Sequence, residues 1–303
     1  MEYTKFLKQL RNKGETILFG EEMKTHCSFG VGGKAKYFVI ANSAKTLESI
    51  VKRTNNFYII GNGTNIVFPN KYNGTIIKLG SNFSKIKVSG NKVVAGASTN
   101  LFLLNRALRE KGLAGLEFTF GIPGSVGGAV IMNAGAFGDE IGNYVSKVKV
   151  FDGKKTYWTK DFDFSYRTSS LKKENLVVLF VEFSLAKGKK KNIEAKQKEF
   201  FNKRKQTQPH GEKSAGSVFK RCFINGETVF PAKIIDKLGL KGAKIGDAQV
   251  STKHAGFIVN NGSAKQSDII KLIKIVKNKV KKETDIDLEE EIIILKGNTK
   301  WLS

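Results

Sequence analysis

GLEFTFGIPGSVGGAVIMNAGAFG, residues 115–138, is the segment around which we expect the chain to be organised. It contains seven glycines and one of the protein's four prolines, yet it also carries apolar residues such as Phe118, Phe120 and Ile131. Flexible linkers contain few such residues. Glycine permits positive φ and lets a flat or anionic ligand lie against main-chain N–H groups. A glycine-rich turn packed against a strand is the alternative, but the segment favours a buried backbone site for a large cofactor.

The composition is that of a folded protein with enough residues for two or three domains. Of its 303 residues, 40% are hydrophobic and 22 are phenylalanine. No apolar run reaches the ~18 residues needed to cross a bilayer, and the N-terminal residues lack the apolar core of a secretory signal. Cys27 and Cys222 match no metal-binding or redox spacing, and there are only three histidines. We therefore expect no metal site, no membrane insertion and a cytoplasmic location.

The chain is strongly basic, with a formal net charge of +25. Such a charge is typical of nucleic-acid-binding proteins when the cations are clustered. Here the lysines are spread over the whole chain, and residues 187–191 are the one dense run. We expect a lysine-rich surface that attracts anionic small molecules, and no nucleic-acid partner.

Hydrophobic periodicity and capping residues predict the order of helices and strands. We expect a small α/β unit first, a second unit that contains the glycine-rich segment, and a change of composition near residue 207. The expected helices lie at residues 1–14, 43–52, 100–111, 193–205, 231–238 and 267–282. The expected strands lie at residues 36–41, 57–60, 75–79, 85–88, 92–95, 145–151, 156–159, 176–183, 214–220, 256–259 and 288–295, with residues 165–172 in a loop.

Common nucleotide-binding and hydrolase motifs do not fit. Gly61 and Gly63 begin a dinucleotide fingerprint, but Ile66 stands where its third glycine belongs. Pro123 occupies the first glycine of a nucleophile elbow. The remaining motifs are GNGTN (61–65), the glycine-rich segment, SYRTSSLK (165–172), SAGSVFK (214–220) and LEEE (288–291).

In that order these motifs resemble the UDP-N-acetylenolpyruvoylglucosamine reductases, flavoenzymes of peptidoglycan precursor synthesis. The resemblance runs from about Ser28 to Ile292. It implies an α+β protein with a vanillyl-alcohol-oxidase (PCMH-type) FAD-binding domain in two α/β lobes and a C-terminal α+β substrate-binding domain. The implied boundaries are residues 1–80 for the first lobe, rejoined by a C-terminal strand at 292–303, residues 81–207 for the second lobe, and residues 208–291 for the substrate-binding domain. The spacing after Lys220 is similar to that of the shorter family type, without an extra tyrosine loop.

The resemblance implies an NADPH-dependent oxidoreductase with non-covalently bound FAD. Its substrate would be UDP-N-acetylglucosamine enolpyruvate, reduced to UDP-N-acetylmuramate. Hydride delivery to the terminal CH2 of an enolpyruvyl ether builds negative charge on the carboxylate, and C2 must then be protonated. The resemblance assigns the stabilisation of the carboxylate to Arg167 and Glu291, and the donation of the proton to Ser217.

The resemblance also implies two sets of binding residues. Tyr166, Lys205, Arg221 and Gln249 are candidates for substrate contact, although Arg221-Cys222 stand where the family usually has Asn-Pro. The turn at residues 29–33 is a further candidate for contact with FAD. The principal FAD candidates are Gly61, Asn62, Gly63, Thr64, Asn65, Gly121, Ile122, Pro123, Gly124, Ser125, Gly127, Gly128, Ala129, Asn133, Ala134, Gly135 and Ala136.

Two alternatives stay open at this point. Another FAD oxidoreductase of the same fold, acting on a sugar or lactone, would need neither the carboxylate-binding pair nor the proton donor. A basic nucleic-acid-binding protein would bind duplexes in a salt-sensitive manner. For the favoured enzyme we expect a monomer or weak oligomer.

Overall fold

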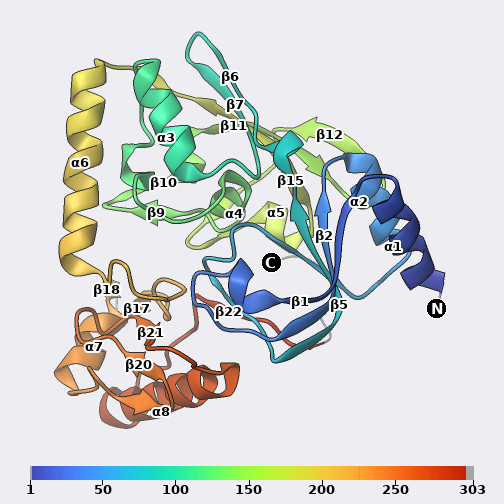
Figure 1. Ribbon diagram of the computed structural model, residues 1–303. Helices are drawn as coiled ribbons and strands as arrows, with labels where there is room; N and C mark the ends of the chain where they lie inside the picture. Colours follow the sequence, from blue (N-terminus) through green and yellow to red (C-terminus); the bar gives the residue numbers. More distant parts are fainter. Residues whose placement is uncertain (1, 225, 298–303) are drawn as a thin grey trace.

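The computed structural model describes residues 2–224 and 226–297, and Figure 1 shows their arrangement. The first lobe holds a four-stranded sheet in the order β1-β2-β5-β3, in which β1 is antiparallel to β2 and the other pairs are parallel. Ser43 Oγ accepts a hydrogen bond of 3.0 Å from the N–H of Thr46, which confirms the predicted helix cap. The elements are α1 (Glu2–Asn12), β1 (Thr16–Glu22), β2 (Lys34–Ala41), α2 (Ala44–Val51), β3 (Phe57–Ile60), β4 (Ile66–Val67) and β5 (Lys71–Leu79).

The second lobe is built on a five-stranded antiparallel sheet in the order β12-β11-β15-β7-β6. Figure 1 shows α6 beside α3 on the outside of this lobe, where Gln197 Nε2 donates to the carbonyl of Asn105 at 3.1 Å. The elements are β6 (Ile86–Ser89), β7 (Lys92–Gly96), α3 (Leu101–Glu110), β8 (Leu113–Ala114), α4 (Val126–Ile131), β9 (Gly135–Ala136), β10 (Asp139–Glu140), β11 (Val145–Phe151), β12 (Thr156–Thr159), β13 (Phe164–Ser165), β14 (Thr168–Ser169), α5 (Ser170–Lys173), β15 (Val177–Ser184), β16 (Ala186–Lys187) and α6 (Lys190–Thr207).

The C-terminal part carries a three-stranded antiparallel sheet, β19-β20-β21, which packs on the buried face of α8. The chain then returns to the first lobe, because β22 pairs in parallel with β4. Residues 298–303 of the expected C-terminal strand lie outside the described residues. The elements are β17 (Cys222–Ile224), β18 (Glu227–Val229), α7 (Pro231–Lys237), β19 (Lys244–Ile245), β20 (Ala248–Val250), β21 (Ile258–Asn260), α8 (Gln266–Thr284) and β22 (Ile293–Ile294).

Hydrophobic packing ties the three parts together. One cluster is shared by the two lobes and includes Ile77 of β5 and Val181 of β15, both fully buried. The C-terminal part has its own cluster, but Phe29 and Val67 of the first lobe are members of it. The walls of the space between the three parts are therefore supported by hydrophobic cores.

Several sequence expectations were wrong in detail. Strand β1 was missed because its residues, TILFGEE, do not alternate and contain Gly20 at φ +67°. Residues 165–172 form a hairpin, β13–β14, and enter α5 instead of a loop. The strands expected at 214–220 and 288–295 are mostly irregular: they meet in the isolated bridge Phe219–Glu290, and only Ile293–Ile294 forms a strand. Among the described residues, no helix is long and apolar enough to cross a membrane.

Candidate active site

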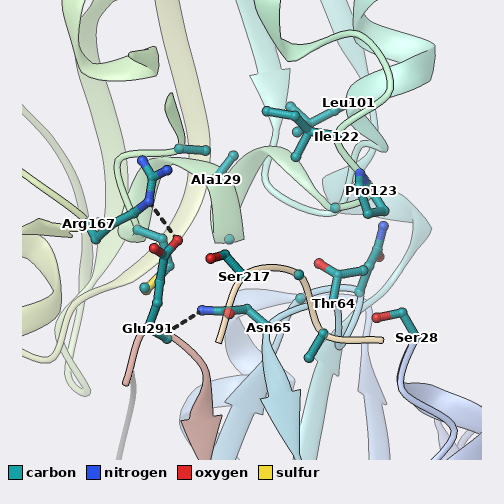
Figure 2. Close-up of a pocket in the computed structure, with 18 of the residues that line it drawn as sticks. Ser28, Thr64, Asn65, Leu101, Ile122, Pro123, Ala129, Arg167, Ser217 and Glu291 are labelled. Atoms are coloured by element: carbon teal, nitrogen blue, oxygen red, sulfur yellow. Dashed lines mark hydrogen bonds and ion pairs between the residues drawn. The ribbon is translucent and has the colours of Figure 1, made fainter. Parts of the chain in front are cut away.

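A central cavity of about 1160 Å³ lies where the two lobes and the C-terminal part meet. Ligand pockets usually measure about 300–1,000 Å³, so this cavity has room for a dinucleotide together with part of a second molecule. Figure 2 shows its lining, which comes from the GNGTN loop, the glycine-rich segment, the β13–β14 turn, and the segments around Ser217 and Glu291.

The GNGTN loop, residues 61–65, connects β3 to β4 and lines the cavity throughout. Gly63 has φ +64°, and a Cβ there would lie 2.1 Å from the carbonyl oxygen of His26. Within the described part of the chain, the N–H groups of residues 62–65 have no hydrogen-bond acceptor in the protein. Successive free amides of this kind bind anions.

The glycine-rich segment contains a short helix, α4, that the sequence analysis did not predict. Ser125 Oγ accepts from the N–H of Gly128, and the N–H groups of Val126 and Gly127 donate to carbonyls of the loop before α3. The first amides of α4 are therefore already bonded. A Cβ at Gly127 would lie 2.8 Å from Cβ of Ala97, so glycine here permits close packing as well as ligand contact.

The lining fits FAD. The loop at 61–65 supplies free amides for a pyrophosphate, as do Gly121, Gly124 and Ser125 within the described part of the chain. Leu101, Ile122 and Ala129 supply apolar surface for a flat ring system. Small residues at 134–136 let such a ring approach the backbone. All of the principal FAD candidates line the cavity except Asn133.

Arg167 lies in the two-residue turn of the β13–β14 hairpin and has φ +56°, which is unfavourable for a residue with a side chain. This conformation aims its guanidinium into the cavity (Figure 2). Nε donates to Glu291 Oε1 at 2.6 Å, and Nη2 donates to the carbonyl of Gly135 at 3.1 Å. The strained turn thus holds a cation beside the glycine-rich segment.

Glu291 is placed by the return of the chain to the first lobe. Its N–H donates to the carbonyl of Val218 at 2.7 Å, and its own carbonyl accepts from Asn65 Nδ2 at 3.1 Å. Burial raises the pKa of the Glu291 carboxyl, while the nearby Arg167 acts in the opposite direction without cancelling this effect. Glu291 therefore takes up a proton more readily than an exposed glutamate.

Ser217 stands beside Glu291, because Phe219 bridges Glu290 in antiparallel register. Its neighbours Ala215, Val218 and Phe219 are buried in the C-terminal core, whereas Ser217 lines the cavity. The hydroxyl makes one long hydrogen bond, 3.4 Å to the carbonyl of Phe219. Figure 2 shows Ser217, Arg167 and Glu291 around the same space, so the three predicted catalytic residues come together.

The predicted substrate residues divide into two groups. Tyr166 and Arg221 line the cavity and contact each other: the N–H of Arg221 donates to Tyr166 Oη at 3.1 Å, and its guanidinium lies 4.5 Å from the ring centre. Lys205 is exposed outside the cavity lining, and Gln249 bonds within the C-terminal sheet region to Gly242 and Asn261.

Asn133 and the turn at residues 29–33 also lie outside the cavity lining. Asn133 is fully buried, and its amide joins the carbonyl of Ser165 to the N–H of Gly142. It fixes the β13–β14 hairpin instead of touching a ligand. Phe29 and Val31 are buried in the C-terminal core, and only the preceding Ser28 faces the cavity.

Other residues of the cavity lining have no recognisable pattern in the sequence. Arg204 on α6 and Lys233 on α7 are single cations in a lysine-rich chain, and His210 has no telling neighbour. Phe137 lies in the glycine-rich segment and was not singled out, although its exposed ring stacks on Phe200 with 4.7 Å between ring centres.

Comparisons with known proteins identify the family of the chain. Residues 208–295 match the family model described as UDP-N-acetylenolpyruvoylglucosamine reductase, C-terminal domain, and residues 35–159 match an FAD binding domain. Curated proteins named UDP-N-acetylenolpyruvoylglucosamine reductase include one from Thermotoga sp. strain RQ2, 40% identical over 98% of this chain and 99% of that protein, and one from Clostridium novyi, 40% identical over 94% and 96%.

A crystal structure of UDP-N-acetylenolpyruvylglucosamine reductase (MurB) from Thermus caldophilus superposes with a TM-score of 0.79 and 32% identity, covering 93% of this chain and 99% of that one. These matches confirm the predicted fold class, an FAD-binding domain followed by a C-terminal α+β domain. The chain belongs to the UDP-N-acetylenolpyruvoylglucosamine reductase family.

Proposed function

We propose that the chain reduces the enolpyruvyl ether of UDP-N-acetylglucosamine enolpyruvate to UDP-N-acetylmuramate, with FAD in the central cavity and NADPH as the hydride donor. The observation that carries this proposal is the grouping of Arg167, Glu291 and Ser217 beside the glycine-rich segment. A cation, a carboxylic acid and a hydroxyl are the three groups that this reduction requires from the protein.

The cavity lining at residues 61–65 and 121–129 would hold FAD, and FAD bound there would supply the hydride for the terminal CH2 of the enolpyruvyl group, with NADPH as the source of that hydride. The C=C electron pair moves toward the substrate carboxylate, and that carboxylate gains negative charge. Arg167 stabilises this charge through its guanidinium. Ser217 donates its hydroxyl proton to C2, so that CH2=C becomes CH3–CH, and a solvent proton restores the hydroxyl.

Glu291 serves this step best in its protonated form. Burial already raises its pKa, and a substrate carboxylate nearby raises it further, because like charges disfavour ionisation. A protonated Glu291 donates a hydrogen bond to the enolate-like oxygens, whereas an ionised one would repel them.

The same cluster disfavours an oxidase of the same fold. Such an enzyme removes hydride from its substrate and needs no proton donor over C2 and no carboxylate-binding cation. The proposed substrates are both anionic nucleotides, which suits the net charge of +25. We further propose that the reaction takes place in the cytoplasm and that the enzyme is a monomer or weak oligomer.

Isotope incorporation tests the proposal. The purified protein, NADPH and the enolpyruvyl nucleotide are incubated in D2O, and the product is examined by NMR. We expect UDP-N-acetylmuramate with one deuterium at C2. Absence of product, or product protonated at C2 without deuterium, would contradict the proposed proton transfer.

A further inference from the structure

Arg204 is a cation in the cavity lining that has no acidic partner among the described residues. It lies in the last turn of α6, and its Cδ is 3.5 Å from the position that a Cβ of Gly121 would take. It therefore packs against the start of the GIPG turn, residues 121–124. Burial lowers the pKa of Arg204 to about 10, and no carboxylate offsets this effect.

The N–H donors of Arg204 form few and long hydrogen bonds. A guanidinium has five N–H donors, but Nη1 reaches Gln208 Oε1 and Nη2 reaches the carbonyl of Phe118 only at 3.4 Å each. Nε is buried with no partner in the described part of the chain. By contrast, Arg167 is bonded to Glu291 at 2.6 Å. A buried donor without an acceptor is costly, so a ligand that supplies oxygen atoms would relieve this arrangement.

The side chain is held in place without being neutralised. Its guanidinium lies 5.3 Å from the ring centre of Phe137, and the ring of Phe201 packs beside it against Gly121. A planar, oriented guanidinium of this kind suits the two oxygens of a phosphate. The adjacent Lys205 is exposed and outside the cavity lining.

We propose that Arg204, and not Lys205, binds a phosphate of a nucleotide in the central cavity, either the pyrophosphate of FAD or that of the uridine nucleotide. The inference rests on the proposed function and adds a phosphate-binding residue to it. The two sources share the same chemistry, and their phosphate-free counterparts, riboflavin and uridine, separate the phosphate contact from general packing.

The test compares R204M with K205M, its neighbour in the same helical turn, by measuring affinities. The apo-proteins are titrated with FAD and riboflavin by flavin fluorescence, and the flavin-loaded proteins with UDP and uridine by calorimetry. We expect R204M to lower the affinity for either FAD or UDP by about tenfold or more, since hydrogen bonds to charged groups are strong. The affinity of R204M for riboflavin and uridine, and every affinity of K205M, should stay within about twofold of the wild-type value.

A loss of FAD affinity without a loss of riboflavin affinity would assign Arg204 to the pyrophosphate of FAD. A loss of UDP affinity without a loss of uridine affinity would assign it to the pyrophosphate of the uridine nucleotide. An equal loss for a nucleotide and its phosphate-free counterpart, or no loss for either nucleotide, would overturn the inference. If R204M shows no cooperative melting, R204K takes its place in the test. This variant keeps the charge but not the planar fork, so it should still weaken the binding of FAD or UDP. Wild-type protein that binds neither FAD nor UDP would overturn the proposed function as well, whereas wild-type binding with unaffected variants would overturn this inference alone.

Discussion

The cofactor end and the catalytic end of the central cavity are built in different ways. At the cofactor end, two continuous segments, residues 61–65 and 121–129, present main-chain amides and small residues. At the catalytic end, three single side chains come from a hairpin turn, an irregular segment and a returning C-terminal segment. Changes at the first end should affect folding and FAD binding, whereas changes at the second should act mainly on turnover.

The largest effect is expected for Ser217→Ala. Removing the proton donor should lower kcat by roughly 10²–10⁴-fold, the usual contribution of a positioned general acid. FAD binding and bleaching of the flavin by NADPH should be unchanged, because Ser217 makes only one long hydrogen bond. Stopped-flow absorbance separates the two half-reactions. Ser184→Ala, at the exposed end of β15, is the control; a slow NADPH half-reaction in S217A would contradict the assignment.

Three consecutive acids provide a matched series. Glu291→Ala should lower kcat by roughly 10²–10³-fold, as expected for the loss of one group that stabilises developing charge. Glu291→Gln should lower kcat by a smaller factor, since its amide can still donate a hydrogen bond. Glu289→Gln should leave kcat nearly unchanged, because Glu289 is exposed and pairs with Lys220 outside the cluster. Steady-state kinetics measure kcat for each variant, and equal losses of kcat at positions 289 and 291 would refute the catalytic role of Glu291.

The cofactor end should respond through stability. Gly63→Ala forces φ +64° on a residue with a Cβ and places that atom 2.1 Å from the carbonyl oxygen of His26. Strain and overpacking together should lower the free energy of unfolding by about 3 kcal/mol and weaken FAD binding. Gly90→Ala has the same sign of φ but open space around it, so it should cost about 1 kcal/mol. Urea unfolding compares the two; equal costs would show that the close approach is unimportant.

The smallest expected effect is a pH dependence. The pKa of Glu291 is raised in the folded protein by burial. Between the ordinary glutamate pKa and this raised value, the folded state binds more protons than the unfolded state, so stability falls as the pH rises. Wild-type protein should therefore lose stability relative to Glu291→Gln across that window and hold a constant difference above it. Thermal melting at a series of pH values measures this; a wild-type protein that gains stability relative to Glu291→Gln as the pH rises would contradict the buried-acid description.

The two ends also differ in how far the sequence predicts them. Main-chain sites are visible as glycine patterns, and Ser43 caps α2 at the start of the helix expected at residues 43–52. Side-chain sites depend on tertiary contacts: the buried amide of Asn133 fixes the hairpin that carries Arg167, and the register that places Glu291 beside Val218 joins segments far apart in the chain. The family resemblance supplied those residues, but it also suggested Lys205. Only the fold shows that α6 turns Arg204 toward the cavity instead.

The visible absorption spectrum of the purified protein, recorded under argon, decides whether the chain is a flavin-dependent reductase of the enolpyruvyl nucleotide. We expect a flavin spectrum that bleaches with NADPH and returns when UDP-N-acetylglucosamine enolpyruvate is added. A flavin that only oxygen restores would contradict the proposed substrate. A colourless protein that takes up no added FAD would contradict the assignment of the central cavity itself.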